Sequence, residues 1–433
     1  MQRAATRRSV LLGLLAGVGL VGCGGGGASD QAAARPIQLW HLFEGADGKV
    51  MTAMLDQVVA RTSPVQATCF AWGAPYYTKL AMASAGGRPP DLAVMHASRL
   101  NGYAPGGLLQ PYDMGVLARA GITEASFAPA VWERCRYQDE LYALPLDTHP
   151  FVTFTNLDIA AKAGILGTDG QPAPITSQEQ FVAVGRKLAE VTGGLGIAYG
   201  FLLDTAQAWR LFWGLYGQTG GEYDFAGPKA RWDDAQAIRV VTFLASLFAD
   251  GVLSRNLDYD GSVSAFTTGR AGMILSGEWE GASFVKSVKN LGAAPMPTLF
   301  DRPAGYADSH TFVLPRRELA DPAAVERRVR AVAVAAGLVQ EGLRWAGGGH
   351  IPAYLPIVAD PRYGQLKPQS SYAQAAQSVF LDPPVPFAGP GTEFQKRMSA
   401  QLTRGFLGTD TPQATVAGML AVVDDLLSIP RPA

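Results

Sequence analysis

The sequence has little of several features that would identify a class of protein at once. It has only 3 cysteines in 433 residues, too few for a disulfide framework, and a formal net charge of −1 with no basic stripe to bind nucleic acid. Hydrophobic residues make up 48% and charged residues 17%, which excludes a largely disordered chain. The sequence also lacks the Gly-x-Ser-x-Gly, His-Glu-x-x-His and phosphate-loop motifs, so the enzyme classes that carry them are disfavoured.

The first residues resemble an export signal. Three arginines precede the apolar run Val10–Val21, which is too short to span a bilayer as a helix, and Leu20-Val21-Gly22-Cys23 then matches the bacterial lipobox. Residues 1–23 are therefore predicted to be a lipoprotein signal peptide with Cys23 as the lipidated residue, and residues 24–35 a glycine-rich tether. An ordinary secretion signal with an incidental cysteine is the alternative. The stretch Thr6–Leu11 also resembles a twin-arginine signal, although Val10 stands where that signal prefers Phe.

Apart from Cys23, only Cys69 and Cys135 remain. Export would permit a disulfide between them, but their spacing carries no signature of one. Cys69 lies in an apolar, strand-like run, so a buried free thiol is at least equally expected.

The region 37–95 has the pattern of a parallel sheet covered by helices. Apolar runs at 37–43, 65–71 and 91–95 predict strands, and residues 45–61 and 76–85 between them predict helices. Trp40 follows the alternating Ile37 and Leu39 and is expected to point into the core, which leaves His41 facing a cleft. At this length two domains are expected.

Several short motifs, in a consistent order, carry a family resemblance. They are Trp72-Gly73, Tyr76-Tyr77-x-Lys79-Leu80, Gly87-x-Pro89-Pro90-Asp91-Leu92, Gly107-x-Leu109-x-Pro111-Tyr112-Asp113, Phe266-x-x-Gly269-Arg270-Ala271-Gly272-Met273-Ile274 and Gly277-Glu278-Trp279. In this order they resemble the extracellular solute-binding proteins related to maltose-binding protein, with one small departure at Ser177, where the family usually has Trp. The resemblance covers nearly all of the chain after the tether.

The resemblance implies an α/β, two-lobed, periplasmic-binding-protein-like (type II) fold with a hinge and an interlobe cleft. It also implies a monomeric, lipid-anchored extracytoplasmic receptor, periplasmic or at the cell surface. Such a receptor binds a mono- or oligosaccharide and delivers it to the permease of an ABC importer, without a cofactor or nucleic acid. The alternatives are a receptor for a non-sugar solute and a secreted carbohydrate-active hydrolase or lyase. An enzyme of that kind would need a pair of carboxylates, which Glu44, Glu222, Glu280 and Asp308 could supply by chance.

The stretch Tyr142–Asn156 is predicted to cross between the lobes. An apolar run stops at Asp147-Thr148-His149-Pro150 and then resumes as a β-branched and aromatic strand. Tyr306–Pro315 resembles the second crossing strand. The predicted lobes are residues 36–146 with about 307–345, and residues 147–306 with about 346–433.

Sugar recognition needs flat aromatic faces together with carboxylates, amides or imidazoles for the hydroxyl groups. Residues of these types follow strand ends or lie at crossings, and we expect them to bind ligand: His41, Trp72, Tyr76, His96, Asp147, His149, Glu222, Trp279, Glu280, Asp308, His310 and His350. The resemblance assigns sugar stacking to Trp279. The alternative for Trp279 and Trp72 is a place in the core, and for Asp147 a hinge acid that binds backbone amides.

All five histidines fall in these places, which raises the hypothesis of a metal receptor. No two of them have the spacing of a helical zinc site, and neither remaining cysteine is near one. The sequence therefore predicts no metal site.

Overall fold

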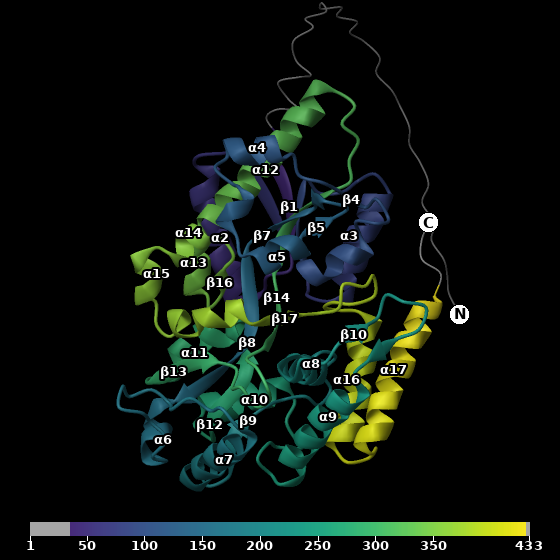
Figure 1. Ribbon diagram of the computed structural model, residues 1–433. Helices are drawn as coiled ribbons and strands as arrows, with labels where there is room; N and C mark the ends of the chain where they lie inside the picture. Colours follow the sequence, from purple (N-terminus) through teal and green to yellow (C-terminus); the bar gives the residue numbers. More distant parts are fainter. Residues whose placement is uncertain (1–34, 430–433) are drawn as a thin grey trace, which may run out of the picture. The chain divides into compact units, whose positions relative to one another are not determined.

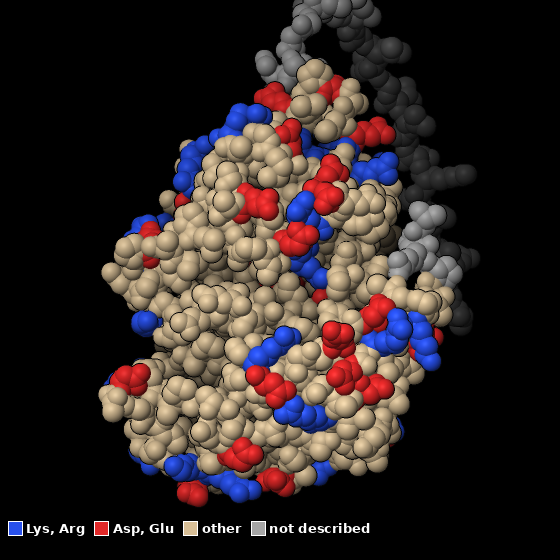
Figure 2. Space-filling view, in the orientation of Figure 1, with Lys and Arg blue, Asp and Glu red and all other residues tan. Residues whose placement is uncertain are grey.

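The computed structural model describes residues 35–429, so the predicted signal peptide, Cys23 and nearly all of the tether lie outside the described residues. Within 35–429 no helix combines the length and apolarity that crossing a bilayer requires. The face shown in Figure 2 carries Lys, Arg, Asp and Glu side chains in a mixed scatter, without a broad patch of either sign.

The first of two large sheets has the strand order β2-β1-β3-β15-β4, with β7 beside β15. Strands β1, β4 and β7 of this sheet are labelled in the upper half of Figure 1. Its strands are β1 (Ile37–His41), β2 (Val65–Cys69), β3 (Leu92–His96), β4 (Leu109–Gln110), β7 (Ala143–Pro145) and β15 (His310–Pro315). The predicted parallel arrangement is confirmed for β1, β2 and β3, whereas β15 runs antiparallel to β3. Apolar residues occupy these strands because helices cover the sheet.

The helices of this half include two that follow the first two strands directly and two that return late in the sequence. They are α2 (Gly45–Val59), α3 (Ala74–Ala85), α4 (Met114–Arg119), α5 (Pro129–Arg134), α12 (Pro322–Gln340) and α13 (Gly342–Gly347). Helix α12 ends at Gln340, and α13 starts directly after Glu341. Both α12 and α13 pack on α2.

Cys69 and Cys135 are free thiols. Cys135 is buried, but Cys69 is exposed, contrary to the expectation of burial. The reason is that β2 is the edge strand of the first sheet and most of its residues face outward.

The second large sheet has the order β17-β14-β8-β12-β9, and β13 and β16 also pair with β8. Its strands are β8 (Asp147–Asn156), β9 (Leu195–Ala198), β12 (Ala271–Gly277), β13 (Leu291–Pro295), β14 (Gly305–Asp308), β16 (Ile351–Pro352) and β17 (Val379–Leu381). The long strand β8 is buried from Asp147 to Thr155 because β12, β13, β14 and β16 all pair along it.

Around this second sheet lie α6 (Leu157–Lys162), α7 (Gln178–Thr192), α8 (Gln207–Thr219), α9 (Asp234–Ala249), α10 (Tyr259–Thr267), α11 (Gly281–Ser287), α16 (Glu393–Phe406) and α17 (Pro412–Ser428). The short helices α14 (Leu355–Val358) and α15 (Pro361–Gln365) follow β16 and lie beside α13 (Figure 1). Helix α8 is buried nearly all round, between the sheet and α16 and α9, which is why it is rich in aromatic residues. Trp209 and Trp213 stack within it, with ring centroids 4.7 Å apart.

The chain passes between the two sheets through very short connections. Strand β7 of the first sheet is followed after Leu146 by β8 of the second, and β14 of the second sheet is followed after Ser309 by β15 of the first. A third passage leads from α13 to β16. The predicted strand Tyr306–Pro315 is thus two strands in two sheets. Each sheet has its own hydrophobic core.

Candidate functional site

A cavity of about 620 Å³ is lined by residues from both sheets and from the strands that join them. Its lining residues are Leu42, Phe43, Glu44, Asp47, Trp72, His96, His149, Asp204, Gln207, Arg210, Tyr259, Asp260, Trp279, Glu280 and His310. Of the predicted ligand-binding residues, six therefore meet here: Trp72, His96, His149, Trp279, Glu280 and His310. They come from five separate stretches of the sequence, and we call this cavity the cleft.

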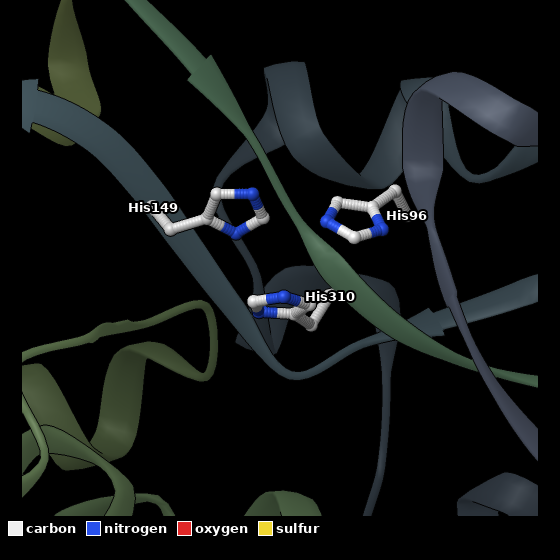
Figure 3. Close-up of side chains that lie close together, drawn as sticks. All are labelled: His96, His149 and His310. Carbon is white, nitrogen blue, oxygen red and sulfur yellow. The ribbon is translucent and has the colours of Figure 1, made fainter. Parts of the chain in front are cut away.

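Three imidazoles lie together in the cleft (Figure 3). His96 ends β3, His149 is the third residue of β8, and His310 begins β15. Strand pairing aligns them, since His310 lies opposite His96 and Asp308 lies opposite His149. The ring centroids are 4.2 Å apart for His149 and His310, 4.7 Å for His96 and His310, and 5.3 Å for His96 and His149. We call these three residues the histidine trio.

Asp147 lies beneath the trio and is fully buried. Its Oδ1 lies 3.0 Å from Nδ1 of His149 and accepts a bond from the backbone amide of His310 at 2.8 Å. Its Oδ2 lies 2.8 Å from Nδ1 of His310 and accepts a bond from Nε1 of Trp345 at 2.7 Å. Burial alone would raise the pKa of Asp147, but these histidines outweigh it and hold the pKa well below its usual range.

Two of the three imidazoles, those of His149 and His96, resist protonation. Burial is the largest cause that lowers the pKa of His149, to about 4, and His310 adds to the effect. The pKa of His96 is well below its usual range, first because of burial and then because His310, His149 and Arg210 are nearby. Nδ1 of His96 lies 2.5 Å from the hydroxyl of Tyr77. His96 and His149 therefore present neutral imidazoles to the cleft at neutral pH.

Two tryptophans lie in the cleft wall. Trp72 is 39% exposed. Trp279 is half-buried, donates from Nε1 to the hydroxyl of Tyr259 at 2.9 Å, and carries the Arg210 guanidinium 5.3 Å from its ring centroid. The Tyr259 hydroxyl in turn donates to Glu280 at 2.6 Å. A Cβ on Gly277 would lie 2.1 Å from the Trp279 ring, so glycine at this position makes room for the indole.

Six predicted residues do not line the cleft, and each has an identifiable reason. His41 shares the buried face of β1 with Ile37 and Leu39, where its Nδ1 accepts a bond from the amide of Phe43 at 3.3 Å. The expected orientation of β1 was therefore wrong, since Trp40 lies on the opposite side. The hydroxyl of Tyr76 is buried and donates to the carbonyl of Val94.

The other predicted residues outside the cleft lining are three acids and one histidine. Asp308 is buried and accepts bonds from the amides of Ser98 at 3.1 Å and Ser309 at 2.8 Å. Glu222 is an exposed residue beyond the end of α8. Asp147 lies behind the trio, as described above.

His350 is fully buried, 2.8 Å from Glu278 and 3.2 Å from Asp47. Burial would lower its pKa, but these carboxylates raise it well above its usual range.

The sequence prediction missed other polar residues of the cleft: Glu44, Asp47, Asp204, Gln207, Arg210, Tyr259 and Asp260. They lie at or near the N-termini of α2, α8 and α10, whereas the prediction concentrated on strand ends. Glu44 and Asp47 follow β1 and could have been found by the same rule. The start of α8 carries no comparable signal, because Asp204 lies in a loop.

The histidines assemble in a way that the spacing argument did not anticipate. Donor atoms of His96, His149 and His310 all lie within 4.8 Å of one another, and so do donor atoms of Asp147, His310 and His350. The His-x-x-x-His spacing of a helical zinc site detects only ligands that lie on the same helix. These histidines come from separate strands. The spacing argument therefore could not detect this cluster.

Comparisons with known proteins agree with this architecture. Residues 70–324, more than half of the chain, match the family described as bacterial extracellular solute-binding protein. The maltotriose-binding protein of Pyrococcus abyssi is 23% identical over 273 residues, which span 61% of this chain and 54% of that protein. The chain thus aligns with about half the length of this curated relative.

Solved structures show the same fold at low sequence identity. The maltose-bound MalE3 of T. maritima superposes with a TM-score of 0.76 and 15% identity, over 90% of this chain and 99% of that one. The GacH receptor of Streptomyces glaucescens, studied with acarbose, gives 0.73 and 16%, over 90% and 98%. The predicted α/β, two-lobed, type II periplasmic-binding-protein-like fold is confirmed. The chain belongs to the family of bacterial extracellular solute-binding proteins.

Proposed function

We propose that this protein is the receptor of a sugar importer and that it binds a mono- or oligosaccharide in the cleft. The observation that carries the proposal is the placing of the exposed Trp72 and the half-buried Trp279 in one cavity with carboxylates, an amide and a guanidinium. Aromatic faces suit the C–H side of a pyranose, and the polar groups suit its hydroxyls. Similar proteins bind maltotriose and maltose.

The direct test is calorimetric titration with a panel of mono- and oligosaccharides that includes maltose and maltotriose. Trp279→Ala should weaken binding of the best sugar by about 1–3 kcal/mol, because one stacking face is lost. The matched control is Trp40→Ala, which removes a half-buried tryptophan outside the cleft and should leave the affinity unchanged. If no sugar binds to the wild-type protein, or if both variants bind equally well, the proposal is wrong.

The bound sugar should be released unchanged. The family consists of binding proteins, and we propose that this chain likewise passes its ligand to the permease subunits of an ABC importer as a monomer. After long incubation, chromatography of the sugar should recover only the starting compound, while a thermal-shift measurement shows that it was bound.

A protein of this family works outside the cytoplasm. We further propose that lipid on Cys23 holds it at the membrane, because Leu20-Val21-Gly22-Cys23 fits the lipobox and a run of glycines follows. Cys23→Ser should abolish labelling by a fatty-acid analogue and release the protein from the membrane fraction. Unchanged labelling and retention would refute the anchor.

We also propose that the two halves, residues 36–146 with about 307–345 and residues 147–306 with about 346–433, move as lobes that close on the ligand. The support is the brevity of the connections at Leu146 and Ser309. Short connections of this kind allow rotation through a few backbone dihedrals.

A further inference from the structure

Each ring of the histidine trio has one nitrogen without a hydrogen-bond partner within 35–429, and sugar binding does not require such a cluster of three imidazoles. In each ring Nδ1 already has a partner, the Tyr77 hydroxyl for His96 and the Asp147 carboxylate for His149 and His310. Nε2 of each ring has no hydrogen bond to any residue within 35–429. Figure 3 shows the three rings gathered around one small space, with a nitrogen of His96 turned toward the other two.

We propose that His96, His149 and His310 bind one divalent transition-metal ion such as Zn²⁺ through their Nε2 atoms, with a further coordination position open to the cleft. This goes beyond sugar binding and does not depend on it. Three imidazoles with a fourth position left open for water or a substrate oxygen form a known type of zinc site. Imidazole suits Zn²⁺, Cu²⁺ and Ni²⁺, whereas Ca²⁺ and Mg²⁺ prefer oxygen ligands.

The distances are compatible with an ion after a small adjustment. One ring nitrogen from each of the three histidines lies within 4.8 Å of the other two. Zn–N bonds of about 2.0–2.1 Å in a tetrahedral site place the nitrogens about 3.4 Å apart, so the widest pair would approach by up to about 1.4 Å. His96 lies on β3 of the first sheet, while His149 lies on the crossing strand β8. A bound ion would therefore tie the two halves together at the floor of the cleft.

The surroundings of the trio match what metal-ligating histidines need. Such histidines almost always bond their other ring nitrogen to a carboxylate or another polar group, which fixes the tautomer and orients the ring. Asp147 does this for two members at once, and it is itself held by Trp345. Tyr77 does it for the third. This arrangement of a buried carboxylate and a tyrosine behind the three rings is the one that metal-ligating histidines use.

Charge in the cleft also favours a cation. Among its lining residues five carry carboxyl groups and one carries a guanidinium: Glu44, Asp47, Asp204, Asp260, Glu280 and Arg210. The second cluster, of Asp147, His310 and His350, is a weaker candidate. There Asp147 is already fully bonded, and His350 is engaged by Glu278 and Asp47.

The test uses the full chain purified without a histidine tag and freed of metal with a chelator. Titration with Zn²⁺ alone should show one ion bound per chain, and Co²⁺ should give the visible absorption of a four-coordinate site with nitrogen ligands. X-ray absorption of the zinc-loaded wild-type protein should count three imidazoles. All five histidines of the sequence lie within the described residues and are buried, so exposed histidines cannot account for that count.

Variants locate the site. His96→Gln, His149→Gln and His310→Gln should each lower Zn²⁺ affinity at least about 100-fold, and Asp147→Asn about 10- to 100-fold, because losing an orienting partner costs that much. The matched control is His41→Gln, which removes a buried histidine of the first sheet that is outside the trio and should change nothing.

Two results would overturn the proposal: no stoichiometric Zn²⁺ uptake by the wild-type protein, or a zinc spectrum with fewer than three imidazoles. Neither measurement depends on whether a variant folds. Failure of the sugar titration leaves this site untouched, and failure of metal uptake leaves the Trp279→Ala test untouched.

Discussion

At the scale of single residues, Asp147 shows how a buried charge organises the site. It makes hydrogen bonds to two histidines, a tryptophan and a backbone amide, so its charge is fully compensated. From the sequence we expected Asp147 to bind ligand, with a bond to backbone amides as the alternative. In the structure Asp147 accepts a hydrogen bond from the backbone amide of His310 and also contacts the imidazoles of His149 and His310. No sequence pattern predicts these contacts, because His310 and Trp345 are far from Asp147 in the sequence and only the fold brings them together.

Asp382 gives a pH-dependent prediction at a different site. It accepts bonds from Nε1 of Trp209 at 2.7 Å and from Nε2 of Gln395 at 2.9 Å, and burial, followed by the charge of Asp308, raises its pKa from 3.8 to about 6. Because the folded state binds this proton more tightly than the unfolded state, the contribution of Asp382 to stability falls as pH rises from about 4 to 6.

Asp382→Asn removes that titration. The free energy of unfolding of the wild-type protein, minus that of the variant, should fall by up to about 3 kcal/mol between pH 4 and pH 7. Denaturant unfolding at unit pH intervals measures it. Asp360 is a control of opposite sign, since Arg362 lowers its pKa to about 2, and Asp360→Asn should not reproduce the trend. A constant difference across the range would contradict the prediction for Asp382.

At the scale of elements, what could be predicted depended on whether the signal was local. The strands β1, β2 and β3 were predicted from apolar runs, and the helices α2 and α3 from the stretches between them, so each was located to within a few residues. The change of sheet at Ser309 has no such signal, because both strands around it are buried. The cleft-lining start of α8 was missed for a related reason: an all-round buried helix lacks a polar face that shows where it begins.

Helix α10 links local capping to the cleft. Its N-cap Asp258 accepts a bond from the amide of Gly261 at 2.8 Å, and its first residues, Tyr259 and Asp260, line the cleft. Asp258→Ala should cost about 1 kcal/mol of stability, because a capping bond is lost. It should also weaken sugar binding, because Tyr259 holds the indole of Trp279.

The matched control is Asp233→Ala, which removes the N-cap of α9, where Asp233 accepts from the amide of Gln236 at 3.1 Å. That helix starts away from the cleft, so stability should fall by a similar amount while the affinity stays unchanged. Thermal unfolding and calorimetric titration of the two variants provide the comparison. Equal affinities for both would show that α10 does not position the ligand.

At the scale of the whole molecule, the two cores and the short crossings argue for motion between the halves. Each sheet has its own buried cluster, and polar residues adjoin the connections at Leu146 and Ser309, namely Asp147, Thr148 and Asp308. A ligand that touches both walls of the cleft gains contacts when the walls approach. It must therefore shift the population toward a closed form, in proportion to its preference for that form.

Small-angle scattering measures this directly. A saturating sugar that binds the wild-type protein should lower its radius of gyration, because closure brings the halves together. Trp279→Ala at the same sugar concentration is the control, since reduced occupancy should leave more of the population open. A Zn²⁺ titration without sugar separates the two proposals: a tighter protein with zinc alone would mean that the histidine trio also draws the halves together. Scattering that is identical with and without bound sugar would refute closure by the ligand.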